Sequence, residues 1–328
     1  MTALSRRRLL WGVAAGVVGC RRGGAGDAPA PVPDAGAPGV AASSAPLALA
    51  RPAARVRVHE LAFAQSSLGA TAASVLELRG SSVEPRLPVL VALHGRGESR
   101  RGVEVGAHAW QRDYALDRAA LRLAEPPLVE ADFGGFVEPA RLAALNASLA
   151  ARPYRGLLVA CPWVPDVLDD RRRADLDASL PFGAFVVDEL LPRVVAELAA
   201  SGERAATGID GVSLGGRVAL VVGLAHPERF GAVGSLQAAL QDAEAPALAR
   251  RAVEVMRRAL LPRLRLVTSE RDFFRGAIAR LDAALTAARV PHEHLLVPGP
   301  HDYAWNRGPG AIEMLLWHDR VLRGEAPL

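Results

Sequence analysis

From residue 55 onward, short apolar segments of strand length alternate with segments of helical periodicity, and this alternation limits the fold more than any other feature. The strand-like segments span 55–63, 73–78, 87–93, 156–161, 206–209, 232–236, 264–267 and 294–297. Helical patterns span 190–198, 217–224 and 275–288. Strands that alternate with helices predict an α/β fold, with a mostly parallel sheet of about eight strands and helices on both faces. The first two strands predict an antiparallel hairpin.

Composition excludes several classes of protein. The 328 residues are 50% hydrophobic and 23% charged, so the chain can bury a large core and is not intrinsically disordered. Every basic residue is Arg, and the 35 acidic residues are interleaved with them, so we expect no nucleic-acid partner. Cys20 and Cys161 lie far apart and outside any CxxC pattern, so neither a disulfide framework nor a zinc site is expected.

The N-terminus resembles an export signal. Three arginines at 6–8 precede an apolar stretch at 9–18, which as a helix spans about 15 Å, too short to cross a bilayer. The arginines resemble a twin-arginine signal, and Val17-Val18-Gly19-Cys20 resembles a bacterial lipobox. We therefore expect a signal peptide (1–20), a flexible Ala/Pro/Gly-rich tether (21–54) and a folded domain (55–328). The protein would be lipid-anchored in the cell envelope through Cys20 or, with cleavage elsewhere, periplasmic or secreted.

A G-x-S-x-G motif marks the candidate nucleophile. Gly211-Val212-Ser213-Leu214-Gly215 lies between the strand-like segment 206–209 and the helical segment 217–224. This chemistry needs a sharp strand-to-helix turn, at which a side chain in either glycine position would collide with neighbouring backbone. The motif predicts that Ser213 projects above the carboxyl end of the sheet, where such sheets bind ligands.

A serine nucleophile needs a base and a carboxylate that orients the base. His301 lies in a turn directly after the last predicted strand, which makes it the candidate base. The loop after the preceding strand offers two carboxylates, and we favour Asp272 while Glu270 remains the alternative. The order serine, aspartate, histidine is typical of one large class of hydrolases.

A loop after the strand 87–93 is the candidate oxyanion hole. It reads His94-Gly95-Arg96-Gly97, and the backbone N–H groups of Arg96 and Leu214 would stabilise the developing negative charge. Gly95 is expected to support this loop, as Gly211 and Gly215 support the serine turn. His94 is interpreted as a structural residue, because His301 already provides a base.

Together these residues resemble the α/β-hydrolase fold and, within it, the esterase family that includes esterase D, feruloyl esterases and mycolyltransferases. The resemblance covers roughly residues 55–325 and rests on His94-Gly95, Pro162, Phe185, 188–192, 211–216 and 299–303. It implies a serine esterase for small-molecule esters that needs no metal or organic cofactor. Asp210 departs from the family, which commonly has a small residue there, and a charge at this place needs a partner or solvent.

The segment 98–155 is long for a connection between two strands. It contains two helical stretches, 109–123 and 139–149, around a glycine-bearing apolar part with Phe133 and Phe136. It would either fold over Ser213 as a lid with a substrate pocket or pack against the sheet edge. Trp163 would line the same pocket or belong to the core.

The sequence thus predicts a serine hydrolase that cleaves carboxylic esters through an acyl-enzyme on Ser213. An acyltransferase or a peptidase would use the same site with a different acceptor or substrate. A surface lipoprotein that keeps the fold without catalysis is the alternative outside the enzymes. Activity towards a short acyl ester separates the last alternative from the others. The sequence does not define the oligomeric state.

Overall fold

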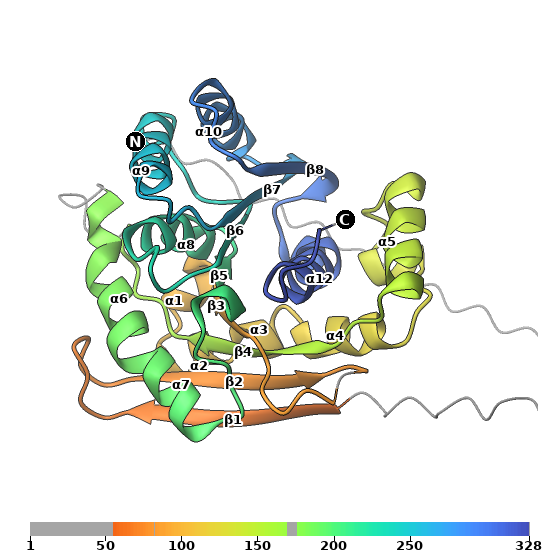
Figure 1. The fold of residues 1–328 in the computed structure, drawn as a ribbon, viewed down its shortest axis with the longest axis horizontal. Helices are drawn as coiled ribbons and strands as arrows, with labels where there is room; N and C mark the ends of the chain where they lie inside the picture. The colour runs from red at the N-terminus through yellow and green to blue at the C-terminus, as the bar shows by residue number, and fades with distance from the viewer. Residues whose placement is uncertain (1–54, 82, 169–175, 328) are drawn as a thin grey trace, which may run out of the picture. The chain divides into compact units, whose positions relative to one another are not determined.

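The computed structural model describes residues 55–81, 83–168 and 176–327. The expected signal peptide, the tether and Cys20 lie outside these residues. The described part contains an eight-stranded sheet in the order β1-β2-β4-β3-β5-β6-β7-β8 (Figure 1). The predicted fold class, a mostly parallel sheet of about eight strands, is confirmed.

The sheet begins with the expected antiparallel hairpin, and the strands after β4 are parallel. β1 pairs antiparallel with β2, and β2 pairs antiparallel with β4. All later pairings are parallel. The strands are β1 (Arg55–Phe63), β2 (Thr71–Arg79), β3 (Val89–Leu93), β4 (Gly156–Pro162), β5 (Thr207–Gly211), β6 (Ala232–Leu236), β7 (Arg263–Arg271) and β8 (Glu293–Pro300).

Helices cover both faces of the sheet, because the central strands are apolar on both sides. In β3, Val89 and Val91 belong to one buried cluster, whereas Leu90 belongs to the other. The first cluster is covered by α6 (Leu180–Phe185), α7 (Leu191–Glu197), α8 (Leu214–Ala225), α9 (Ala245–Arg257) and α10 (Arg275–Ala287). The second is covered by α3 (Ala109–Arg112), α4 (Leu116–Ala124), α5 (Pro139–Ala151) and α12 (Ala311–Val321). Figure 1 shows α8 and α12 on opposite sides of the sheet.

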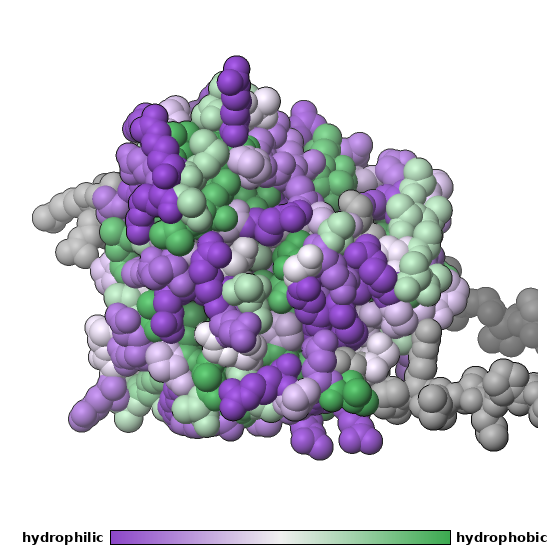
Figure 2. Space-filling model, viewed as in Figure 1, coloured by the Kyte–Doolittle hydropathy of each residue, from purple (hydrophilic) through white to green (hydrophobic). Residues whose placement is uncertain are grey.

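Short helical turns make the remaining connections. They are α1 (Arg96–Ser99), α2 (Val103–Ala107), α11 (Tyr303–Trp305), the 3-10 turns η1 (Glu130–Phe133), η3 (Leu176–Ser179) and η5 (Arg204–Ala206), and the π-helical turns η4 (Val186–Leu190) and η6 (Asn306–Gly310). The face drawn in Figure 2 mixes hydrophilic and hydrophobic residues.

The segment 98–155 lies largely within the helical layer on one face of the sheet. Trp110, Leu123 and Leu145 are fully buried in the same cluster as Leu90 of β3 and Leu315 of α12. Burial of these side chains, worth about 1.5–3 kcal/mol each, holds the segment against the sheet. This packing corresponds to the second alternative, a layer against the sheet, and Glu98 and Tyr114 are the residues of the segment that line the candidate site.

Candidate active site

Ser213 occupies the turn between β5 and α8 in a strained backbone conformation. Its φ is 56° and its ψ is −116°, a combination that residues with a side chain rarely adopt. Such conformations cost on the order of 1–3 kcal/mol and persist only where the surroundings fix them. Here the Ser213 N–H donates to Leu236 O (2.9 Å), and the Ser213 carbonyl accepts from the Ala239 N–H (2.8 Å). The turn is thus fixed by β6 and the loop that follows it.

The glycines of the motif are required by close backbone contacts. A Cβ atom at Gly211 would lie 2.5 Å from the carbonyl carbon of Gly215. A Cβ atom at Gly215 would lie 2.2 Å from the carbonyl oxygen of Leu93. Both distances are far below van der Waals contact, so any larger residue would displace the turn from β3.

Asp272 and His301 form a hydrogen-bonded pair. The His301 Nδ1 lies 2.8 Å from Asp272 Oδ1, and the Asp272 side chain is completely buried. The carboxylate also accepts hydrogen bonds from Thr268 Oγ1 (2.7 Å) and from the Phe274 N–H (3.0 Å). Glu270 is exposed, so Asp272 is the carboxylate that the structure brings to His301.

Ser213 and His301 line one cavity of about 270 Å³. In the described part of the chain the two side chains make no direct hydrogen bond, and catalytic contacts of this kind often form only in the complex with substrate. Phe273 stacks on the His301 imidazole, with 4.3 Å between the ring centroids. The remaining lining residues are Gly95, Arg96, Gly97, Glu98, Tyr114, Val212, Phe274, Asp302, Tyr303 and Asn306.

The candidate oxyanion loop lies directly against the nucleophile. A Cβ atom at Gly95 would lie 3.8 Å from Ser213 Cβ. Arg96 is the first residue of α1 and Leu214 is the first residue of α8, and the first N–H groups of a helix have no carbonyl partner inside it. The Arg96 side chain forms an ion pair with Asp166 (2.8 Å), so only its backbone is suited to the oxyanion role.

His94 holds this loop in place and is not placed to act as a base. Its Nδ1 lies 2.9 Å from Gly95 O, and its Nε2 accepts a hydrogen bond from the Val164 N–H (2.9 Å). Burial lowers the pKa of His94 to about 4, so the ring is neutral at pH 7. Both ring nitrogens are therefore occupied by the backbone.

A hydrogen-bonded group formed by the buried Glu98 and Tyr114 and the exposed Tyr303 supports the loop, and the sequence analysis missed it. Tyr114 Oη accepts a hydrogen bond from the Gly95 N–H (3.1 Å) and donates one to Glu98 Oε2 (2.5 Å). Tyr303 Oη donates to the other oxygen of the Glu98 carboxylate. Burial and Glu98 raise the pKa of Tyr114 well above its usual value and that of Tyr303 to about 12. Both tyrosines are thus protonated donors at neutral pH.

Sequence signals for this group were weak. Glu98 follows the His-Gly-Arg-Gly loop directly, and Tyr303 is part of the Gly-Pro-His-Asp-Tyr segment. Tyr114 comes from a helical pattern that we expected to be continuous over 109–123. The helix instead ends at Arg112, and Ala115 takes a left-handed conformation with φ 51°.

Three side chains expected as possible pocket residues, Phe133, Phe136 and Trp163, are not among the lining residues of the cavity that contains Ser213. Phe133 is buried in the core, and Phe136 lines a separate cavity of about 60 Å³ together with Phe133 and Val297. The Trp163 Nε1 donates to Ser99 O (3.2 Å). The cause is the packing of residues 98–155 against the sheet, which carries the phenylalanines into the layer around α12.

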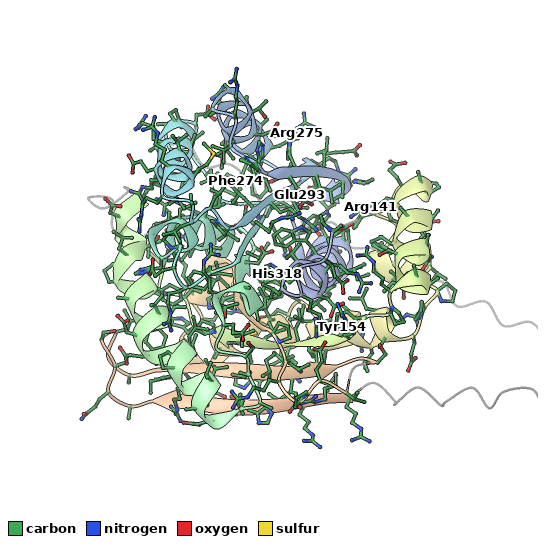
Figure 3. The ribbon with its side chains drawn as sticks, in the orientation of Figure 1. Arg141, Tyr154, Phe274, Arg275, Glu293 and His318 are labelled. Atoms are coloured by element: carbon green, nitrogen blue, oxygen red, sulfur yellow. The ribbon has the colours of Figure 1, made fainter. Side chains whose placement is uncertain are left out.

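Asp210, the departure from the family pattern, has a buried partner. Its Oδ2 lies 3.0 Å from the Nε2 of His318, and its Oδ1 accepts from the Gly211 N–H (2.7 Å). His318 projects from α12, whereas Phe274 of the candidate site precedes α10 (Figure 3). Burial lowers the pKa of His318, and the neighbouring Asp210 partly opposes this. The Asp210 carboxyl group therefore has hydrogen-bond partners beneath the serine turn.

Within 55–81, 83–168 and 176–327, no group of three or more His, Cys, Asp or Glu side chains is arranged to hold a metal ion. Over the same residues, the helices are all too short or too polar to cross a membrane.

The sheet order, the strained serine turn and the Asp272–His301 pair define the α/β-hydrolase fold. A family model described as "Putative esterase" matches residues 176–263, which include Ser213 but neither Asp272 nor His301. No curated protein gave a match.

The superposition with several solved structures of the same fold covers nearly the whole length of those structures. A ferulic acid esterase superposes with a TM-score of 0.58 at 16% identity, over 82% of this chain and 99% of that chain. S-formylglutathione hydrolase (FrmB) from Staphylococcus aureus gives 0.54 at 15% identity, over 82% and 98%. The fluorophosphonate-binding serine hydrolase F of Staphylococcus aureus gives 0.54 at 14% identity, over 81% and 99%. These likenesses establish the fold.

Proposed function

We propose that this chain is a serine hydrolase that cleaves carboxylic esters through an acyl-enzyme on Ser213. One observation carries the proposal: a serine in a strained strand-to-helix turn shares a cavity with a hydrogen-bonded histidine–aspartate pair. The match of residues 176–263 to an esterase family supports the choice of substrate class.

The geometry supports a two-step reaction. Because the His301 Nδ1–H donates to Asp272, the unprotonated Nε2 is available to take the proton of the Ser213 hydroxyl. The serine oxygen attacks the ester carbonyl, and the N–H groups of Arg96 and Leu214 stabilise the resulting oxyanion. His301 then returns the proton to the departing alcohol. A water molecule, activated by the same imidazole, releases the acid and restores Ser213.

Access of water favours hydrolysis over acyl transfer. Phe273, which stacks on the imidazole at the cavity, is 72% exposed. An acyltransferase needs a site that holds back water while the acceptor binds. An alcohol acceptor such as methanol, added during turnover, tests this choice. Hydrolysis predicts free acid as the main product, and acyl transfer predicts the methyl ester.

The proposal is tested with p-nitrophenyl acetate and the Ser213→Ala variant. We expect hydrolysis to fall by about four orders of magnitude or more, because no other group can form the acyl-enzyme. Ser201→Ala, at a partly exposed serine outside the cavity, is the matched control and is expected to keep full activity. Equal hydrolysis by Ser213→Ala and the wild type would contradict the proposal.

We also propose that the chain is exported and attached to a membrane through a lipidated Cys20. The arginines at 6–8 and the Val-Val-Gly-Cys tetrad support this. Cells fed an alkyne-labelled fatty acid are expected to label the wild type, and Cys20→Ala should lose the label and leave the membrane fraction. An unlabelled wild-type protein would instead indicate ordinary secretion and refute the anchor.

A further inference from the structure

Asn306 presents an unexplained polar group at the candidate site. It is the first residue of the π-helical turn η6, and it lines the cavity that contains Ser213 and His301. Asn306 is only 6% exposed. Within the described residues, no group hydrogen-bonds either end of its amide, and Oδ1 is buried without a partner.

An unpaired buried amide is costly. Leaving such a group without a hydrogen bond costs about 1–3 kcal/mol, so native proteins pair nearly all of them. π-helical turns are also rare and recur at functional sites. Ser213 apart, the other polar side chains that line the cavity do have hydrogen-bond partners among the described residues: Arg96, Glu98, Tyr114, His301, Asp302 and Tyr303.

We propose that Asn306 is a specificity-determining residue that hydrogen-bonds a hydroxyl group of the substrate. The substrates would then be esters with a hydroxyl group in the acyl or the alcohol part, close to the scissile bond. This inference rests on the proposed function and deepens it. The inference rests on the unpaired amide of Asn306. The described residues offer it no hydrogen-bond partner, and a bound substrate would provide one.

The chemistry of the cavity selects a hydroxyl over other polar groups. A hydroxyl both donates and accepts, so it can pair with Oδ1 or, after rotation of the amide, with Nδ2. An anionic substituent is disfavoured because the buried carboxylate of Glu98 lines the same cavity. Phe273 and Phe274 offer apolar surface beside His301 for the rest of the ester.

The test compares matched esters with and without a hydroxyl group. One arm pairs p-nitrophenyl glycolate with p-nitrophenyl acetate, which places the hydroxyl in the acyl part. The other pairs 2-hydroxyethyl acetate with ethyl acetate, which places it in the alcohol part. For each pair, the ratio of kcat/KM values is measured in the wild type, in Asn306→Leu and in Gln111→Leu. Gln111 lies outside the cavity lining and controls for the loss of an amide.

We expect the ratio to fall about fivefold to tenfold in Asn306→Leu, in one arm, and to stay unchanged in Gln111→Leu. That arm identifies the part of the ester that carries the hydroxyl. Unchanged ratios in both arms would overturn the role of Asn306, while Ser213-dependent hydrolysis would still uphold the proposed function. Loss of the dependence on Ser213 would overturn the proposed function instead.

A second measurement keeps Asn306 in place, in case Asn306→Leu does not fold. Binding of the four esters to the inactive Ser213→Ala protein is measured by calorimetry. The hydroxylated ester of one pair is expected to bind about fivefold to tenfold more tightly than its partner. Equal affinities within both pairs would overturn the inference.

Discussion

A part-buried histidine–aspartate pair lines the candidate site and a fully buried one lies beneath the serine turn, and the difference between them shows what turns such a pair into a proton carrier. His301 and Asp272 meet at 2.8 Å beside the cavity, and His318 and Asp210 meet at 3.0 Å beneath the serine turn. The His301 side chain keeps 11% of its surface exposed, whereas that of His318 has none.

The two rings also use their nitrogens differently. His301 gives Nδ1 to its carboxylate and keeps Nε2 for the cavity, whereas His318 gives Nε2 to Asp210. The His318 Nδ1 is buried without a partner, and a Cβ atom at Gly208 would lie 2.7 Å from it. No substrate can reach that nitrogen. The His301–Asp272 pair therefore suits catalysis, whereas the His318–Asp210 pair links α12 to β5.

Removing the carboxylate of each pair gives the largest expected contrast. Asp272→Asn should lower kcat about 10³- to 10⁴-fold, because the imidazole loses its orientation and its stabilising charge. Asp210→Asn should lower kcat less than tenfold in protein that remains folded. Hydrolysis of p-nitrophenyl acetate measures both, with the exposed Glu270→Gln as control. Equal losses of kcat in Asp272→Asn and Asp210→Asn would contradict the assignment of different roles to the two pairs.

The structural pair should dominate stability. His318→Leu leaves Asp210 buried without its partner, which is expected to lower the free energy of unfolding by about 3–5 kcal/mol. His301→Leu should change it less, because this ring borders a cavity that solvent can enter. Urea unfolding of the two variants checks the order. A larger loss in His301→Leu would reverse our assignment of roles.

His94, which is buried like His318, sharpens the comparison through pH. Its folded pKa of about 4 lies below the ordinary value of 6.5, so the unfolded chain binds a proton that the folded chain does not. The stability is complete above pH 6.5 and falls as the pH drops from 6.5 towards 4, by roughly 3 kcal/mol in total. Unfolding of the wild type and of His94→Gln is compared at pH 7 and pH 4.5. The variant should show a flatter dependence, and parallel curves would contradict the assignment.

The smallest expected effect concerns the support of the oxyanion loop. Tyr114→Phe removes the acceptor of the Gly95 N–H, so the loop loses one fixed contact. We expect kcat to fall about tenfold with KM nearly unchanged, because the contact positions a group that acts in the transition state. Tyr303→Phe, which leaves the Gly95 contact intact, is the matched control and should lose less. A rise in KM alone would instead assign Tyr114 to substrate binding.

Local patterns predicted most of the fold. Each strand-like segment overlaps an observed strand, because buried parallel strands are continuous apolar runs. Helix α9 was missed, although its buried residues recur at helical spacing opposite a charged face. The break before α4 was missed because it depends on Tyr114 reaching Glu98, a contact that no local pattern encodes.

The candidate site was predictable to the extent that its residues lie at strand ends. Ser213, Asp272 and His301 each follow a strand, so the topology of the sheet alone brings them to one edge. The pocket was not predictable in this way. Phe133 and Phe136 lie within a long connection whose direction is set by packing around α12. Asn306 became a candidate only because the structure shows its buried Oδ1 without a hydrogen-bond partner.

The central claim is that the serine hydroxyl in the strained turn is the group that the histidine activates. The wild-type protein is treated with a fluorophosphonate probe and digested, and the modified peptide is located by mass spectrometry. The account predicts a single modification at Ser213 that is strongly slowed in His301→Ala. Modification at another residue, or labelling at an undiminished rate in His301→Ala, would contradict it.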